Sequence, residues 1–437
     1  MYCTCTVLRS FYFHDYSGKI ARCSTGYVPI LLYVLNVQSS VAADITIKKL
    51  QLVTNIIPGG GTRAETMADV VCLRDLEKFA ERYQAKWVRD YYTSGANSEQ
   101  TLSDNVDAFK RIRLCPQLLK DVSNVDLSTT LLGEKISFPV AIAPTGMQSL
   151  AHPQGEVATA KAAASMQTGM ILSTWSNKSM EEVVSVAPSC LHWFQLYIVK
   201  DGGLTASLVK RAEKAGYKAL VVTVDTPVVG LRLPDLRNGF QVDSSIRYYS
   251  VIFLSLPHLE KVQKSPDQEG DMYGPISISP AVTWKDIEWL KQITSLPIVL
   301  KGILTAEDAK MAVKSGVAGI IVSNHGGRQL DGVLASIDAL PEVVEAVKGT
   351  DVEVYLDGGV RQGTDVLKAL ALGARAVFVG RPALWGLTYK GEEGVHLMLE
   401  ILKREFSVAM ALSGCTDAKN IPESIIRYLP TQMSAKL

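Results

Sequence analysis

The sequence has few of the residues that build disulfide frameworks or metal sites. It contains seven cysteines and six histidines among 437 residues, and its closest cysteine pair is Cys3 and Cys5, a CxC. No paired CxxC motif is present, and no group of His, Cys and Asp residues has the spacing of metal ligands. We therefore predict free thiols in a reducing compartment and no metal cofactor.

Charge of one sign and long apolar runs are also scarce. The net charge is +1 with 20% charged residues, so no polybasic face indicates a nucleic-acid partner. The apolar run of residues 28–37 is too short to cross a bilayer and lies too far into the chain for a signal peptide. We expect a small-molecule site, with no nucleic acid and no membrane partner.

Eight apolar, β-type segments follow residue 138, and a helix-like segment follows each. Continuous rather than alternating hydrophobicity is typical of parallel strands buried on both faces. A doubly wound sheet needs fewer strands, so we predict an α/β fold, a (β/α)8 TIM barrel. The predicted strands are residues 139–143, 170–174, 191–197, 219–225, 297–301, 318–322, 352–357 and 376–380.

Local signals support the helices of this barrel. Ser179, Thr283 and Thr305 each stand three residues before an acidic residue, the spacing at which a capping box satisfies free helix amides. Before the barrel, residues 73–91 are predicted to form an N-terminal helical segment, followed by a connection that covers the barrel bottom or its mouth.

The segment SNHGGRQLD, from Ser323 to Asp331, follows the predicted strand of residues 318–322. TIM-barrel active sites lie at the C-terminal ends of the strands, so His325 is placed to accept a proton and Arg328 to bind an anion. For an isolated HGGR, a turn with solvated His and Arg side chains is the simpler interpretation. Motifs after other strands favour the site.

Three other strand ends carry motifs that suit an anionic ligand. Lys301 lies near the end of the buried run PIVLKG, where a lysine has little reason to lie without an anionic partner. The alternative is a lysine whose side chain extends to solvent at the barrel rim. DGGVR and VGRP follow the seventh and eighth strands, where barrels often bind phosphate. Their glycines let backbone amides approach it, and Arg361 and Arg381 add positive charge. Two ordinary turns are the alternative here.

Taken together, these motifs closely resemble the FMN-dependent (S)-2-hydroxy acid oxidases, the family of glycolate oxidase and the long-chain hydroxyacid oxidases. The resemblance implies a family domain over residues 67–437, with an atypical lid loop at residues 241–279. Residues 1–66 do not resemble the family. We interpret them as an extension, disordered or produced by a gene-model error, with a targeting role as the runner-up.

The resemblance implies FMN as the cofactor. Lys301 would stabilise the negative charge of the reduced ring. Gly146 stands where family members often have alanine, a change expected to matter little. The residues expected to contact FMN are Pro144, Thr145, Gly146, Ser173, Gln195, Thr223, Lys301, Ser323, Asp357, Gly358, Gly359, Arg361, Gly380 and Arg381.

The resemblance also assigns roles around the substrate. His325 would remove a proton, with Asp225 stabilising the imidazolium; a capping role beside Pro227 is the alternative for Asp225. Whether the electrons move as hydride or after a carbanion forms stays open. The residues expected to contact the substrate are Tyr91, Trp175, Tyr197, Arg232 and Arg328, with the arginines and Tyr91 on the carboxylate and Tyr197 on the hydroxyl.

These features predict an oxidase that converts (S)-2-hydroxy acids to 2-oxo acids and passes the electrons to O2, yielding hydrogen peroxide. Residues 257–279 resemble the short lid of the long-chain isoform, whereas Tyr91 and Trp175 match glycolate oxidases. We expect medium or long-chain acids to be preferred, as in fatty acid metabolism. The alternatives are a glycolate oxidase, a lactate-type FMN dehydrogenase, and a flavin-binding but inactive isoform, disabled by the foreign segment at residues 241–256 and serving only as an assembly partner.

The last three residues, Ala435, Lys436 and Leu437, fit the small-basic-leucine pattern of a peroxisomal address that an import receptor binds. A peroxide-forming oxidase beside a catalase-rich organelle is consistent with that address. The family resemblance further implies a homotetramer.

Overall fold

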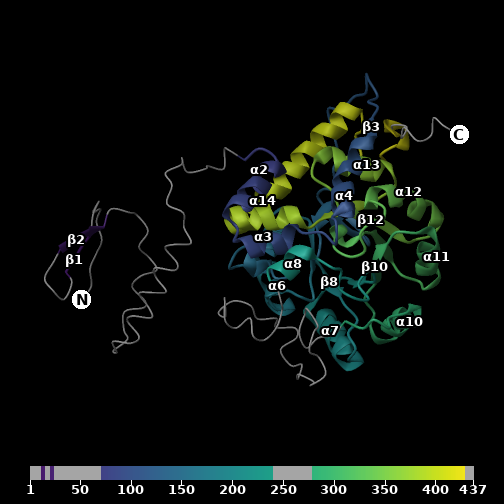
Figure 1. Ribbon diagram of the computed structural model, residues 1–437. Coiled ribbons are helices and arrows are strands. Elements are labelled where there is room, and N and C mark those ends of the chain that lie inside the picture. The colour runs from purple at the N-terminus through teal and green to yellow at the C-terminus, as the bar shows by residue number, and fades with distance from the viewer. Residues whose placement is uncertain (1–10, 15–19, 24–69, 240–277, 429–437) are drawn as a thin grey trace. The chain divides into compact units, whose positions relative to one another are not determined.

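The computed structural model describes residues 11–14, 20–23, 70–239 and 278–428 (Figure 1). The chain forms two compact units, Met1–Glu65 and Thr66–Leu437. In the first unit, β1 (Phe11–His14) pairs with β2 (Ile20–Cys23) in antiparallel fashion. Most of the predicted extension, the lid up to residue 277 and the tail Ala435–Leu437 lie outside the described residues.

The second unit is built on a closed barrel of eight parallel strands, which confirms the predicted TIM barrel. Each predicted segment overlaps one of them, although β7 begins one residue before its predicted segment and β10 ends two residues after its own. Around the barrel their order is β10-β11-β12-β13-β6-β7-β8-β9. The strands are β6 (Val140–Ile142), β7 (Gly169–Leu172), β8 (Leu191–Leu196), β9 (Leu220–Thr223), β10 (Ile298–Ile303), β11 (Gly319–Val322), β12 (Glu353–Asp357) and β13 (Ala376–Val379).

Side chains fill the barrel interior. Successive residues of a strand point to opposite faces, so in β6 Ala141 joins the interior cluster, while Val140 and Ile142 join the cluster that packs against the helices. Trp193, Tyr355 and Phe378 meet inside, with ring centroids 5.6–5.7 Å apart. The hairpin of β4 (Thr129–Leu131) and β5 (Glu134–Ile136) adds Leu131 and Ile136 to this cluster. It lies at the N-terminal end of the barrel, where Leu132 N donates to the side chain of Glu353, the first residue of β12.

Helices surround the barrel (Figure 1). All three predicted residues cap a helix, but only Thr283 forms the full capping box. The Ser179 and Thr305 side chains accept hydrogen bonds from the backbone N–H groups three residues on, and Thr283 forms a capping box with Asp286. The helices are α5 (Glu156–Ser165), α6 (Met180–Val186), α7 (Gly202–Ala215), α8 (Leu233–Arg237), α10 (Trp284–Ile293), α11 (Ala306–Lys314), α12 (Ser336–Ala346), α13 (Gly363–Ala371) and α14 (Arg381–Ser413), with 3-10 turns η3 (Gln148–Leu150), η5 (His325–Gly327) and η6 (Glu423–Ile425).

The predicted helical segment at residues 73–91 is two helices rather than one. α2 (Leu73–Tyr83) and α3 (Lys86–Thr93) are separated by Gln84 and Ala85, and the backbone of Gln84 is extended. The Gln84 Nε2 atom donates a hydrogen bond of 2.6 Å to Thr388 Oγ1 on α14, which fixes the break. α4 (Gln100–Arg111) follows and leads into β3 (Ile112–Leu114), which pairs with β14 (Ile426–Tyr428).

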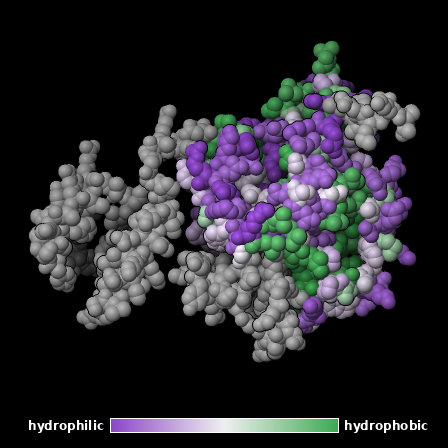
Figure 2. Space-filling view, in the orientation of Figure 1, coloured by the Kyte–Doolittle hydropathy of each residue, from purple (hydrophilic) through white to green (hydrophobic). Residues whose placement is uncertain are grey.

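The surface seen in Figure 2 is largely hydrophilic, with separate hydrophobic patches. Among the described residues, no helix combines the length and the apolar character needed to cross a membrane.

Candidate active site

A pocket lies at the C-terminal ends of the barrel strands, where TIM-barrel enzymes bind their ligands. All predicted site residues line it except Asp225 and Ser323, which lie directly behind His325 and Lys301. The lining comprises Tyr91 from α3; Pro144, Thr145, Gly146, Ser173, Trp175, Gln195, Tyr197, Thr223 and Arg232 from β6 to α8; and Lys301, His325, Arg328, Asp357, Gly358, Gly359, Arg361, Gly380 and Arg381 from β10 to α14.

His325 and Asp225 form a hydrogen-bonded pair. The His325 Nδ1 atom lies 2.8 Å from Asp225 Oδ1, and Thr226 Oγ1 donates to the same carboxylate oxygen over 2.8 Å. A carboxylate oxygen can only accept, so Nδ1 carries the ring proton and Nε2 keeps its lone pair. The pair therefore presents a base toward the pocket.

The surroundings set the charge of each partner. Burial lowers the pKa of His325 below its usual value, against the opposing charge of Asp225. Burial works against ionisation of Asp225, but the charges of His325 and Lys301 outweigh it and bring its pKa to about 2. At neutral pH the imidazole is therefore neutral and able to accept a proton, beside a carboxylate that stabilises the imidazolium.

The backbone at His325 is held in an unusual conformation. Its φ is +59°, and Gly326 and Gly327 follow with φ of +65° and +73°. For a residue with a Cβ, the left-handed region costs roughly 1–2 kcal/mol, so the surrounding contacts must maintain it. At the neighbouring strand, Gly302 permits the close approach of Asp225, because a Cβ there would lie 2.6 Å from the Asp225 Cβ.

Lys301 is a buried cation in the same site. Its Nζ donates to Ser323 Oγ at 3.0 Å and lies 3.4 Å from Asp357 Oδ2. Burial disfavours the charged ammonium, but the carboxylates of Asp357 and Asp225 outweigh it, and the pKa of Lys301 is raised. The ammonium is thus permanently charged.

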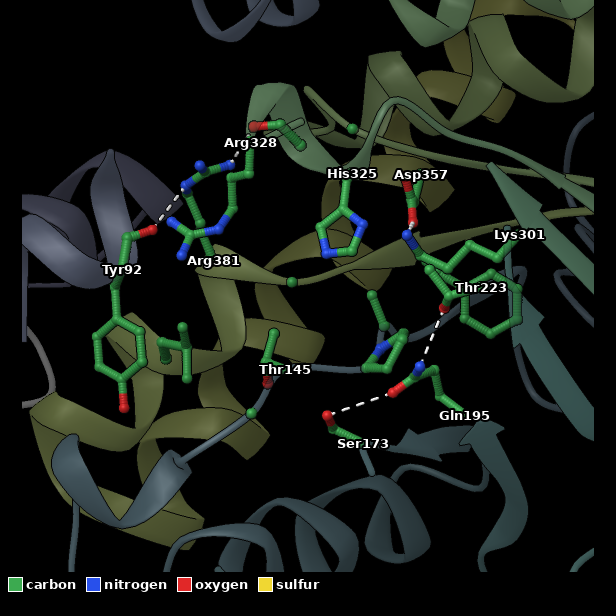
Figure 3. Close-up of a pocket in the computed structure, with 18 of the residues that line it drawn as sticks. Tyr92, Thr145, Ser173, Gln195, Thr223, Lys301, His325, Arg328, Asp357 and Arg381 are labelled. Carbon is green, nitrogen blue, oxygen red and sulfur yellow. Dashed lines mark hydrogen bonds and ion pairs between the residues drawn. The ribbon is translucent and has the colours of Figure 1, made fainter. Parts of the chain in front are cut away.

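Polar side chains extend from Lys301 along one side of the pocket. The Gln195 Nε2 atom donates to Thr223 Oγ1 at 3.0 Å, while Gln195 Oε1 accepts from Thr174 N and from Ser173 Oγ. These bonds fix the orientation of the amide. This side of the pocket can pair with both donors and acceptors of a planar heterocycle (Figure 3).

Arginines gather on the opposite side of the pocket. Arg381 and Arg328 both donate to the Ser94 carbonyl oxygen, at 3.0 and 2.9 Å, and Figure 3 shows their guanidinium groups close together. Burial, together with repulsion from Arg328, Arg361 and Arg232, holds the pKa of Arg381 well below its usual value. Arginine stays protonated nonetheless, so this side concentrates positive charge.

Backbone amides converge at the same place. α14 begins at Arg381, directly after Gly380, and its N-terminal amides and dipole favour an anion. Gly359 lies so close to α4 that a Cβ would stand 1.9 Å from the Asn105 carbonyl oxygen. Arginines, glycine amides and a helix N-terminus together form a site suited to a phosphate.

A family model described as FMN-dependent dehydrogenase matches residues 80–428. This chain belongs to the FMN-dependent dehydrogenase family. Its predicted cofactor, FMN, and its predicted assignment to the FMN-dependent 2-hydroxy acid oxidases are confirmed.

Named relatives support the assignment. The chain is 52% identical over 365 residues to 2-Hydroxyacid oxidase 1 of Homo sapiens, an alignment that covers 84% of this chain and 98% of that protein. It is 49% identical over 363 residues to Glycolate oxidase of Spinacia oleracea, covering 82% and 96%. A crystal structure of mandelate oxidase with benzoyl-formic acid superposes with a TM-score of 0.74 at 39% identity, covering 82% of this chain and 98% of the other.

The two sides of the pocket fit the two ends of FMN. Arg381, Arg361 and the amides around Gly359 and Gly380 would hold the phosphate, because they offer positive charge and N–H donors. Gln195, Thr223 and Lys301 would hold the ring system, where a fixed ammonium stabilises negative charge.

Several pocket residues were not predicted from the sequence. Tyr92 lines the pocket, donates from its hydroxyl to the Met147 carbonyl oxygen, and holds Arg381 through its own carbonyl oxygen. Its position beside Tyr91 was the available signal. The other unpredicted lining residues are Ala143, Thr226, Val229, Ile278, Gly326, Val360, Phe378, Val379 and Leu384.

Proposed function

We propose that this enzyme oxidises (S)-2-hydroxy acids to 2-oxo acids, with O2 as the final electron acceptor and hydrogen peroxide as the second product. The proposal rests on one observation: the His325 imidazole, hydrogen-bonded to Asp225, lines the same pocket as the guanidinium groups of Arg328 and Arg232. A base and an anion site in one pocket suit a substrate that carries both a removable proton and a carboxylate.

Each side chain has a defined task in this proposal. Arg328 binds the substrate carboxylate, and its hydrogen bond of 2.6 Å to the Tyr91 carbonyl oxygen orients the guanidinium. His325 Nε2 accepts the proton, and Asp225 stabilises the resulting imidazolium. Tyr197 contacts the substrate hydroxyl. When bound, FMN supplies the two-electron acceptor that O2 reoxidises.

We further propose a preference for medium or long-chain acids. Val229 and Ile278 give the pocket apolar lining. Exposed aliphatic side chains also lie on the loops after β9 and β11, among them Leu231 and Leu330, at 53% and 71% exposure. Buried methylenes contribute about 0.8 kcal/mol each, so an alkyl chain lying along such surfaces would gain affinity.

One observation favours glycolate oxidase as the second candidate. Trp175 lines the pocket, and its ring centroid lies 6.2 Å from that of Tyr197, which we expect to contact the substrate. An indole at this point would crowd a bulky substituent on the α-carbon. The glycolate oxidases among the relatives are consistent with this alternative.

An anaerobic titration tests the central proposal. Purified protein that carries FMN should lose its flavin absorbance on addition of an (S)-2-hydroxy acid and regain it with stoichiometric peroxide when air is admitted. If the reduced flavin is reoxidised rapidly by a cytochrome or quinone but only slowly by O2, the protein is the lactate-type dehydrogenase. Bound flavin that no 2-hydroxy acid bleaches would identify the inactive isoform.

We also propose a peroxisomal location and a homotetramer. The support is the C-terminal Ala435-Lys436-Leu437, which suits an import receptor, and the family resemblance. A fluorescent protein fused at the N-terminus should give peroxisomal puncta that become cytosolic when these three residues are deleted. Light scattering of the FMN-bound protein measures the oligomer.

A further inference from the structure

α4 packs against two of the loops that form the pocket, although it precedes the barrel in sequence. Its residue Asn105 is 2% exposed and does not line the pocket. The Asn105 backbone carbonyl faces Gly359 of the proposed phosphate site. Its side chain instead faces Asn324, the residue immediately before His325.

The two asparagine side chains form a reciprocal amide pair. Asn105 Nδ2 donates to Asn324 Oδ1 at 2.8 Å, and Asn324 Nδ2 donates to Asn105 Oδ1 at 2.8 Å. Asn105 Oδ1 also accepts from Ser336 N at 3.2 Å, and Asn324 Nδ2 also donates to the Leu334 carbonyl oxygen at 3.1 Å. Asn324 is 4% exposed, so the loss of one partner would leave buried polar atoms unpaired.

The amide pair spans the strained turn at His325. Asn324 Oδ1 accepts a further hydrogen bond from Gly327 N at 3.1 Å, so this one oxygen joins the two ends of the turn. His325, Gly326 and Gly327 all have positive φ. Gly327 also lies against α4, since a Cβ there would be 2.6 Å from Leu102 N.

We propose that Asn105 is a positioning residue for His325 and acts through Asn324. By fixing the Asn324 amide from outside the barrel, it holds the turn in the conformation that places His325 Nδ1 on Asp225. The inference rests on the proposed role of His325 as the proton acceptor.

The test compares Asn105→Ala and Asn105→Ser with Ser103→Ala as a matched control. Ser103 lies on the same helix, and its hydroxyl bonds Asp107 at an exposed position. We expect both Asn105 variants to bind FMN with a dissociation constant within about threefold of the parent and to keep a similar KM. Their kcat per bound flavin should fall about tenfold or more, because a displaced His325 is less well placed to accept the proton in the transition state.

Three further variants make the result decisive. If Asn105 acts through Asn324, the double variant Asn105→Ala/Asn324→Ala should be no slower than Asn324→Ala alone. An unchanged kcat per bound flavin in the Asn105 variants, with a lower melting temperature, would overturn the inference and leave Asn105 a purely structural residue. His325→Ala tests the proposed function separately from the role of Asn105. A loss of about 10² to 10⁴ in turnover would support His325 as the proton acceptor, whereas near-normal turnover would refute that role.

Discussion

At the scale of single residues, Arg328 gives the sharpest prediction. Its guanidinium is held by two carbonyl oxygens and lies over the Tyr91 ring at 5.1 Å. Lysine has neither a planar fork nor the geometry to keep these contacts. We expect Arg328→Lys to lose at least about 2 kcal/mol of transition-state stabilisation. The loss should appear in kcat/KM, through both a higher KM and a lower kcat. Normal oxidation of 2-hydroxy acids by this variant would show that another group binds the carboxylate.

Trp175 decides between the two substrate classes. With the native tryptophan, kcat/KM should rise from glycolate to 2-hydroxyoctanoate, because each buried methylene contributes about 0.8 kcal/mol. Trp175→Ala should raise it further for the longer acid, since the indole takes up space only near the first carbons. A steep fall with chain length in the parent, relieved by Trp175→Ala, would instead identify a glycolate oxidase.

At the scale of elements, Asp331 ties the loop after β11 to the start of α4. Its carboxylate accepts from Ser98 N and Thr101 N at 3.1 and 2.9 Å. Partial burial disfavours the charged form of Asp331, but the hydrogen bonds to the carboxylate together have the larger effect. The pKa of Asp331 therefore falls to about 2 from a usual 3.8. A carboxyl whose pKa is lower in the folded state stabilises the fold above its unfolded pKa, and the contribution is lost as pH falls toward 2.

Asp331→Asn should therefore lower the free energy of unfolding by about 1 kcal/mol at pH 7, because a neutral amide oxygen accepts these hydrogen bonds more weakly than a carboxylate does. The difference between variant and parent should shrink between pH 5 and pH 2 in urea titrations. Glu393→Gln, at an exposed position of α14, is the control. A pH-independent difference would mean that the charge of Asp331 does not contribute.

The elements differ in how well the sequence predicts them. The eight strands could be predicted because each is a continuous apolar run, and the three caps because their side chains act over three residues. The break between α2 and α3 could not be predicted, because it involves the hydrogen bond from Gln84 to Thr388, a contact between residues far apart in the sequence. Asn105 and Tyr92 were missed for the same reason: they reach the site from helices that precede the barrel, without a strand end to mark them.

At the scale of the whole molecule, we predict that residues 67–437 suffice for activity. The alignment with human 2-Hydroxyacid oxidase 1 covers 98% of that protein with 84% of this chain, and the family match begins at residue 80. A protein that starts at Met67 should bind FMN and turn over within a few-fold of the full chain. Insoluble or flavin-free protein would show that the extension contributes to folding.

The arginine cluster also links this fold to its cofactor supply. Without an anion, Arg328, Arg361 and Arg381 repel one another across a buried site, so the protein lacking FMN should melt at a lower temperature. Ligand at a hundred times its dissociation constant adds about 2.7 kcal/mol to stability, which thermal melts with and without added FMN would measure. In a cell short of riboflavin, the FMN precursor, more of the protein would lack FMN. That fraction would unfold more often and be degraded by proteases, so the amount of enzyme would fall as well as its activity.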